Sequence, residues 1–188
     1  MVELYHRKIL LLRFLVVRLR TFIHYIYLIK LVQNMNYIDI TSPDVNNGEG
    51  CRVTLWVAGC KHNCKGCHNP KTHDYRAGEL FTEETYKELS EILSKPYISG
   101  LTLSGGDPLC QQQITLAEIE NLVKRVKQDF PSKTIWIYTG YYREYLKGIQ
   151  LEILKYCDVL VDGPYVEELR DITLPFRGSS NQKIHKLH

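Results

Sequence analysis

Residues 59–70, with the sequence GCKHNCKGCHNP, place three cysteines at C-x3-C-x2-C spacing and constrain the fold more than any other part of the chain. They directly follow an apolar run, residues 53–58, whose Val, Thr, Leu and Trp are typical of a β-strand. A strand that ends in a loop of closely spaced thiols can hold a metal centre. The sequence therefore predicts a metal site in this loop.

The number of ligands separates two kinds of metal site. A cubane [4Fe–4S] cluster has four iron corners that are usually bound by Cys thiolates, so three cysteines leave one iron open to another molecule. Structural zinc takes four N or S ligands, usually as two spaced pairs, and here only His62 or His68 could complete such a set. The spacing favours an iron–sulfur cluster and leaves zinc open. Cys51, Cys110 and Cys157 stand alone, and we expect them to be buried or incidental thiols.

The length and charge of the chain limit the classes of protein to consider. Its 188 residues, 44% of them hydrophobic, suffice for one domain with a substantial core. Of 24 Lys and Arg and 21 Asp and Glu, residues 1–34 hold six cations and one acid, which leaves 18 cations and 20 acids, a net charge of −2, for residues 35–188. This slightly acidic body carries no general nucleic-acid footprint, and we expect no nucleic-acid partner.

Residues 1–34 differ in composition from the rest. Residues 9–32 are very apolar, but four Lys or Arg interrupt them, so no window matches the ~20 mostly uncharged residues of a spanning helix. A signal peptide would carry its charges before the apolar stretch and would end in a small-residue cleavage site. A basic amphipathic helix on a membrane surface stays open as an alternative. We expect an extension outside the fold, a domain over residues 35–188, and a cytoplasmic protein without firm membrane association.

From Met35 onward the pattern alternates between strands and helices. Runs rich in β-branched and aromatic residues predict strands at residues 37–40, 52–58, 100–104, 134–139 and 158–162. Apolar residues at helical spacing predict three helices: one capped by Thr82 and ending before Pro96, one around residues 119–130, and one around residues 151–154. This alternation predicts an α/β fold with a parallel sheet and right-handed crossovers.

Four loops follow predicted strands, and parallel strands place such loops on one rim of the sheet. These loops are the cysteine loop and residues 104–108, 139–141 and 162–164. In the second of them, Gly105 and Gly106 let the backbone approach a ligand closely. With Asp107 behind the glycines, we predict that this loop binds a ligand's ammonium group beside an open iron.

A three-cysteine loop after the first long strand and a Gly-Gly-acid loop after a later strand resemble the radical SAM superfamily. More closely, residues 35–188 are similar to the anaerobic ribonucleoside-triphosphate reductase-activating proteins, which are glycyl-radical activases. Five blocks carry the resemblance: residues 59–69, 103–109 (LSGGDPL), 136–141, 158–163 and 177–182 (RGSSNQ). The resemblance begins at Met35, which agrees with an extension over residues 1–34.

This resemblance implies an enzyme that uses a [4Fe–4S] cluster and S-adenosyl-L-methionine. Cys60, Cys64 and Cys67 would bind three irons, and the amino and carboxylate groups of S-adenosylmethionine would bind the fourth. The implied cofactor-binding residues are Gly66, Cys67, His68, Gly105, Gly106, Asp107 and Thr139. Reductive cleavage would give a 5′-deoxyadenosyl radical, which would take a hydrogen atom from a glycine of the partner, and no catalytic side chain beyond the cluster and cofactor is implied.

The resemblance also implies a fold and two partners. Because residues 35–188 are too few for eight β/α units, we expect a shortened, open (β/α) partial TIM-type barrel with a mostly parallel sheet. The partners would be the glycyl-radical subunit of anaerobic ribonucleoside-triphosphate reductase and a low-potential electron donor such as flavodoxin. Gly66 stands where many superfamily members carry an aromatic residue, and Asp107 stands where many carry Glu. The superfamily's adenine-stacking role therefore does not transfer directly to this loop. His68 could either stack near the adenine or cap the loop.

Two alternatives share some of these features. An activase of a formate-lyase-type glycyl-radical enzyme would have the same cysteine and glycine loops, although residues 177–182 argue against it. A zinc-binding regulatory module would use the cysteines with a histidine.

Anaerobic reconstitution with iron and sulfide separates the cluster from zinc. We expect the protein to bind iron and to show broad visible absorbance from thiolate–iron charge transfer. A colourless protein that retains zinc in metal analysis would contradict the cluster.

Overall fold

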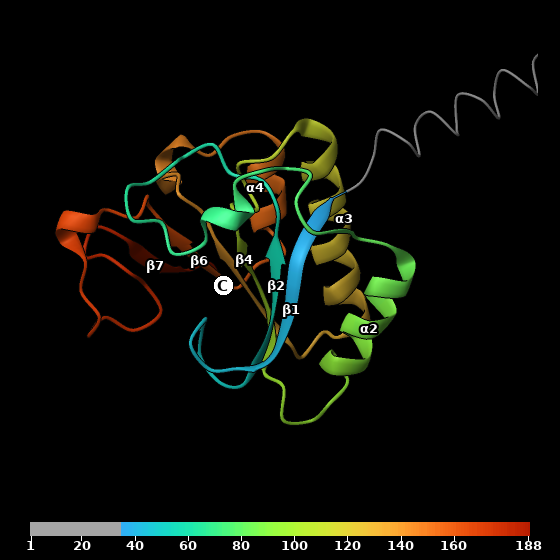
Figure 1. Cartoon of the computed structure of the whole chain (residues 1–188). Helices are drawn as coiled ribbons and strands as arrows, with labels where there is room; N and C mark the ends of the chain where they lie inside the picture. The colour runs from blue at the N-terminus through green and yellow to red at the C-terminus, as the bar shows by residue number, and fades with distance from the viewer. Residues whose placement is uncertain (1–34) are drawn as a thin grey trace, which may run out of the picture. The chain divides into compact units, whose positions relative to one another are not determined.

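The computed structural model describes residues 35–188, which form an α/β unit on one seven-stranded sheet (Figure 1). The strands are β1 (Asn36–Asp44), β2 (Arg52–Val57), β3 (Glu79–Leu80), β4 (Gly100–Gly105), β5 (Thr134–Tyr138), β6 (Val159–Asp162) and β7 (Lys183–Lys186). The helices are α2 (Glu83–Leu93), α3 (Gln113–Asp129) and α4 (Ile149–Leu154), with 3-10 turns η1 (Pro70–Thr72), η2 (Arg143–Tyr145) and η3 (Glu167–Leu169). The predicted extension, residues 1–34, lies outside the described residues.

The middle of the sheet is parallel and its edges are antiparallel. The strand order is β3-β1-β2-β4-β5-β6-β7, and β2, β4, β5 and β6 run parallel as predicted. β1 pairs antiparallel with β2 because the seven-residue connection, residues 45–51, is too short for a parallel crossover. The strand predicted at residues 37–40 extends to Asp44, and the edge strands β3 and β7 were not predicted. Their sequences, EL and KIHK, carry little strand signal, so pairing with a neighbour decides their structure.

The central strands present two different faces, because successive side chains of a strand point to opposite sides. One face is apolar, fully buried and packed against α2, α3 and α4. Its strand residues are Val53, Leu55, Val57, Leu101, Leu103, Ile135, Ile137 and Leu160. The opposite face carries Arg52, Thr54, Trp56, Thr102, Ser104, Trp136 and Tyr138. The helices therefore cover only one face (Figure 1), and the other is available to loops and ligands.

The helices begin and end close to the predicted positions. At the start of α2, the Thr82 hydroxyl accepts from the Thr85 N–H (3.3 Å) and the Thr85 hydroxyl accepts from the Thr82 N–H (3.2 Å). This reciprocal cap confirms Thr82 as the N-cap, and α2 ends before Pro96 as expected. α3 begins earlier than the apolar pattern indicated, at Gln113.

The expected α/β class is confirmed, and the sheet is parallel in its middle, although three of its six strand pairs are antiparallel. Closure toward a partial TIM-type barrel stays a prediction. Within residues 35–188, no helix combines the length and the apolar character that crossing a membrane requires.

Leu103, on β4 directly before the glycine loop, tests the packing of the helix-covered face. It is fully buried, so Leu103→Ala should lower the free energy of unfolding by about 2–5 kcal/mol through lost burial and a cavity. Leu151→Ala is the control, because this α4 side chain is 45% exposed and should change stability by less than about 0.5 kcal/mol. Equal losses in urea unfolding of the two variants would contradict this packing.

Candidate functional site

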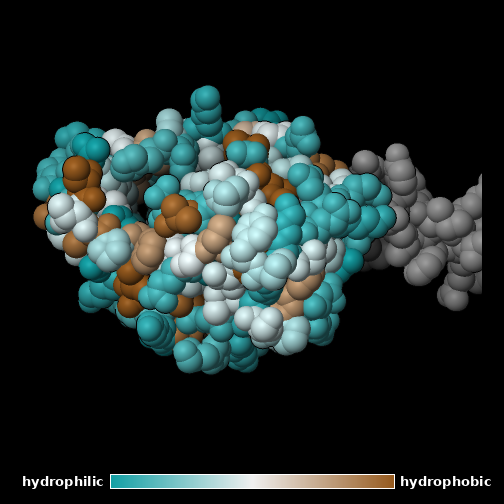
Figure 2. All heavy atoms as spheres, turned by 90° about the horizontal axis from the view of Figure 1, so that it is seen from below, coloured by the Kyte–Doolittle hydropathy of each residue, from teal (hydrophilic) through white to brown (hydrophobic). Residues whose placement is uncertain are grey.

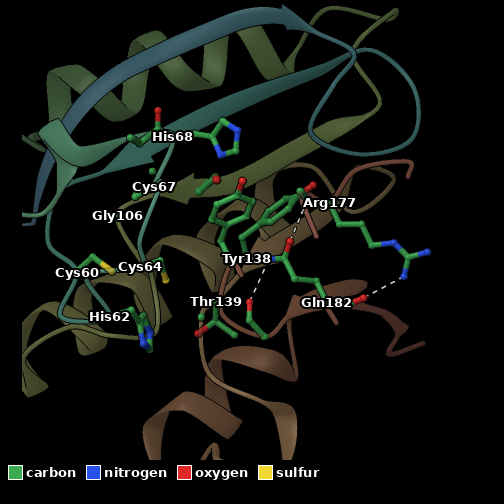
Figure 3. Close-up of a pocket in the computed structure, with 17 residues that line it drawn as sticks. Cys60, His62, Cys64, Cys67, His68, Gly106, Tyr138, Thr139, Arg177 and Gln182 are labelled. Atoms are coloured by element: carbon green, nitrogen blue, oxygen red, sulfur yellow. Dashed lines mark hydrogen bonds between the residues drawn. The ribbon is translucent and has the colours of Figure 1, made fainter. Parts of the chain in front are cut away.

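A cavity lies at the carboxyl ends of the central parallel strands (Figure 3). Its walls include residues of the cysteine loop after β2, the glycine loop at the end of β4, Thr139 and Gly140 after β5, and Gly163 after β6. The prediction that these four loops meet on one rim of the sheet is therefore confirmed. All three cysteines of the motif line this cavity.

The cysteine loop is tied down by its own backbone. The Gly59 N–H donates to the Thr72 carbonyl (2.7 Å), and the Cys67 N–H donates to the Cys64 carbonyl (3.1 Å). The three cysteines are partly exposed and form no disulfide. Burial raises the pKa of the Cys60 thiol to about 12, so the free thiol is protonated at neutral pH. These free thiols in one tight loop suit a metal centre.

The two glycines of the β4 loop are required by contacts within the protein. Gly105 has φ +108°, and a Cβ there would lie 2.6 Å from the Val57 carbonyl oxygen. At Gly106 a Cβ would lie 2.4 Å from the carbonyl oxygen of Gly59 in the cysteine loop. The Gly106 N–H donates to that same Val57 carbonyl (2.8 Å). The glycines thus bring the β4 loop against the cysteine loop while both also line the cavity.

Asp107 lies behind the cavity and binds three neighbouring segments. Its carboxylate is 1% exposed, and one oxygen accepts from the two backbone N–H groups at positions 109 and 110. The other oxygen accepts from the Thr139 hydroxyl (2.9 Å) and the Gly140 N–H (2.9 Å), and lies 2.6 Å from His62 Nε2. Asp107 does not line the cavity, and its direct contact with a ligand's ammonium group stays a prediction.

The partner of Asp107, His62, belongs to the cysteine loop. The hydrogen bond to Asp107, with a further one to Cys110, raises the pKa of His62 to about 10, so the imidazole is protonated at neutral pH. The ring also packs edge-on against Tyr141, with centroids 4.6 Å apart. His62 and Asp107 therefore form a charged pair that joins the cysteine loop to the glycine loop.

Cys110 is buried, as expected for a lone thiol, but it belongs to this network. Burial alone would raise its pKa, yet hydrogen bonds from His62 and Tyr141 outweigh burial and lower the pKa of this thiol. Donor atoms of His62, Asp107 and Cys110 lie within 4.8 Å of one another, a separation that a metal ion could bridge. His62 already pairs with Asp107 (2.6 Å), whose carboxylate also accepts from the Cys110 N–H (3.1 Å), so the proximity of these groups is explained without an ion.

The other wall of the cavity comes from the carboxyl-terminal segment, which the sequence had left without a role. Arg177, Gly178 and Gln182 line the cavity together with Tyr165. The Gln182 side chain accepts from the Gly178 N–H (2.9 Å) and donates to the Gly163 carbonyl (3.0 Å), which joins this segment to the end of β6. Arg177 Nη1 donates to the Gln182 carbonyl (3.0 Å, Figure 3). The block RGSSNQ was conspicuous in the sequence, but no spacing rule connected it with the cysteines.

The structure brings most of the predicted site residues together. Those that line the cavity are Cys60, Cys64, Cys67, His68, Gly105, Gly106 and Thr139. Gly66 and Asp107 do not line it. Gly66 has φ +73°, and a Cβ there would lie 2.2 Å from the Glu167 carboxylate, so it serves the turn of the loop. His68 packs edge-on against Tyr165, with centroids 4.9 Å apart.

Comparisons with known proteins agree with this arrangement. A family model described as a 4Fe–4S single cluster domain matches residues 46–185, which include the three cysteines of the loop. Three relatives named anaerobic ribonucleoside-triphosphate reductase-activating protein match most of the chain. The protein of Enterobacteria phage T4 is 53% identical over 150 residues, which cover 80% of this chain and 93% of the relative. The chain belongs to this family.

Bacterial members of the family give the same result. The protein of Haemophilus influenzae is 44% identical over 154 residues, with 81% of this chain and 98% of the relative covered. That of Escherichia coli strain K12 is 41% identical over 155 residues, with 81% and 99% covered. Family membership and the 4Fe–4S domain favour the iron–sulfur alternative over zinc.

Asp107→Asn tests the network behind the cavity. Every group around this carboxylate is a donor, so the amide nitrogen of Asn would face another N–H or O–H, and the charge pair with His62 would be lost. We expect a loss of about 3 kcal/mol in the free energy of unfolding of the metal-free protein, measured with urea. Glu168→Gln is the control, because it removes an exposed ion pair of the same cysteine loop, to Lys65. Asp107→Asn should be the less stable of the two, and equal stability would exclude the structural role of this carboxylate.

Proposed function

We propose that this protein is an iron–sulfur oxidoreductase of the radical SAM type. It would reductively cleave S-adenosyl-L-methionine and generate the glycyl radical on anaerobic ribonucleoside-triphosphate reductase. The observation that carries the proposal is the meeting of a three-cysteine loop and a Gly-Gly loop in one cavity. The names of the relatives support the choice of partner.

The residues of the cavity fit the cofactors that this reaction needs. Cys60, Cys64 and Cys67 would hold a [4Fe–4S] cluster as thiolates and leave one iron without a protein ligand. When bound, the cluster and S-adenosylmethionine supply the electron and the 5′-deoxyadenosyl radical that takes a hydrogen atom from the partner's glycine. The protein supplies binding, orientation and exclusion of water.

The wall beside the cysteines offers contacts to an organic cofactor. Gly105 and Gly106 expose backbone without side chains, so the methionine part of the cofactor can lie against peptide groups. Thr139 presents its short side chain to the same space and is held by Asp107. His68, which lines the cavity and packs edge-on against Tyr165, would stack on the adenine.

Asp107 and Gly66 take indirect roles in this proposal. Asp107 is a positioning residue, because its contacts hold the cysteine loop, the glycine loop and Thr139 at fixed separations. Gly66 gives the cysteine loop a positive φ, which favours glycine over other residues.

The same proposal covers the partners and the compartment. The reductase would present its glycine-bearing subunit, and a low-potential donor such as flavodoxin would supply the electron in the cytoplasm. An activase of a formate-lyase-type enzyme is the second candidate. It is disfavoured because the similar proteins carry the name of the ribonucleotide reductase activator.

Anaerobic reaction of the reconstituted protein with reductant, S-adenosylmethionine and the reductase tests the proposal. We expect 5′-deoxyadenosine and methionine as products and a glycyl doublet in the EPR spectrum of the reductase. Wild-type protein that makes neither product, although it holds its cluster, would overturn the mechanism.

Cys64→Ala tests the ligand assignment in the same assay. Loss of one thiolate should remove most of the iron and reduce 5′-deoxyadenosine formation to background. Cys51→Ala is the matched control, because Cys51 lies before β2 and does not line the cavity. A Cys64→Ala protein with wild-type iron content and activity would exclude this ligand set.

A further inference from the structure

A second recess adjoins the cysteine cavity, and we call it the trough. It lies between residues 45–47, which follow β1, and residues 172–178 of the carboxyl-terminal segment. Its volume is about 630 Å³, within the usual range of ligand-binding pockets. The trough and the cavity share His68, Tyr138, Arg177 and Gly178 as lining residues, so the two spaces adjoin each other. Figure 2 shows a recess between the loops at the left of that view and the rest of the described surface.

Both walls of the trough are held in place. On one wall, Asp44 accepts from the Asn46 N–H (2.8 Å), from the Asn47 side chain (2.7 Å) and from the Thr54 hydroxyl (2.7 Å). A Cβ at Gly48 would lie 2.8 Å from the Trp136 ring, so this loop packs tightly on the face that the helices leave free. The wall is therefore a fixed part of the fold.

The opposite wall is fixed at its base and at its far end. Arg170 and Ser179 form an antiparallel bridge across the base of the loop. Phe176 packs edge-on against Trp136, with centroids 5.4 Å apart, and its carbonyl accepts from the Tyr138 hydroxyl (2.8 Å). Phe176 also has φ +57°, a conformation that costs energy in a residue other than glycine. The contacts of Phe176 hold the backbone at this point, and the next two residues, Arg177 and Gly178, line the cavity.

The trough exposes apolar side chains on both walls. Ile172 is 84% exposed and Val45 is 63% exposed, and both line the trough. Exposed apolar side chains that line one recess can be covered by apolar groups of another molecule. The trough is thus suited to side chains of another molecule that can cover these two residues.

The lining of the trough carries little charge. Its lining residues include no Asp, Glu or Lys, and Arg177 is their only permanent cation. Arg177 is itself held in place, because its Nη1 donates to the Gln182 carbonyl (3.0 Å). An extended peptide could cover Ile172 and Val45 with apolar side chains.

We propose that the trough binds the glycine-bearing segment of the partner reductase in an extended form and leads it into the cysteine cavity. The inference rests on the proposed function, which requires a glycine backbone of another protein to reach the cofactor. The trough suits this requirement because it adjoins the cavity along His68 and Arg177, which line both spaces. A docked segment would also cover the cavity from water during the radical step.

Ile172→Asp and Val45→Asp test the docking surface with the full-length, reconstituted protein. Both side chains are largely exposed, so neither change should disturb folding, and each places a charge where an apolar side chain would dock. We expect each variant to bind the reductase at least about tenfold more weakly than wild type, by biolayer interferometry under anaerobic conditions. The yield of the glycyl EPR signal at limiting reductase should fall with the affinity.

Tyr97→Asp is the matched control. Tyr97 is 56% exposed and lies between α2 and β4, outside the lining of the trough, so reductase affinity should stay at the wild-type value. Dithionite-driven formation of 5′-deoxyadenosine without reductase should be equal in wild type, Ile172→Asp, Val45→Asp and Tyr97→Asp. Wild-type affinity and radical yield in both trough variants would overturn the docking surface, as would an equal loss of affinity in Tyr97→Asp.

The same measurements keep this inference separate from the proposed function. If wild-type protein forms no 5′-deoxyadenosine, the radical mechanism fails. The docking surface is then judged by reductase affinity, which is measured without turnover. If wild-type protein cleaves S-adenosylmethionine without reductase, the radical mechanism stands. If both trough variants then bind the reductase with wild-type affinity, only the docking surface is excluded.

Discussion

The buried carboxylate of Asp107 is the interaction on which the rest of the site depends. It accepts hydrogen bonds from its own loop and from the end of β5, and it pairs with the protonated His62 of the cysteine loop. A buried charge is tolerated only when its hydrogen bonds and its counter-charge are both supplied by the fold. The position of the cysteine loop is consequently coupled to the ends of two parallel strands. This coupling explains why an acidic residue follows the glycine pair although it does not reach the cavity.

The one-sided covering of the sheet decides where chemistry can take place. α2, α3 and α4 pack on the apolar side of β2, β4, β5 and β6. The opposite side carries Thr, Ser, Arg, Trp and Tyr on β2, β4 and β5, and the buried Val159 and Val161 on β6. Loops from both ends of the chain cover this second side, including residues 45–48 and the segment after β6. The cavity and the trough thus lie on a polar face that a sheet covered by helices on both sides would have buried.

Much of the fold could be read from local patterns, and the exceptions have identifiable causes. The parallel centre and the cap at Thr82 followed from alternation and from short-range hydrogen bonding. The sequence did not predict β3 and β7, because these strands have only two and four residues and their composition is largely polar. Such short segments become strands only when a neighbouring strand pairs with them. Polar residues at alternate positions of β2, β4 and β5 indicate that the helices do not cover one face of the sheet. Residues 53–58 were interpreted from the sequence only as an apolar run, and this alternation was not used.

The sequence by itself predicted a metal site in the cysteine loop and placed this loop on the same rim of the sheet as the glycine loop. Both depend on residue types within short stretches that follow strands. Only the tertiary structure decided that Asp107 is buried behind the cavity wall, against His62, and that Arg177 and Gln182 line the cavity. These facts depend on contacts between distant residues, such as the 45 positions that separate His62 from Asp107 and the 32 that separate Asp107 from Thr139. A side chain's direction follows from its packing and hydrogen-bond partners, which a local pattern does not specify.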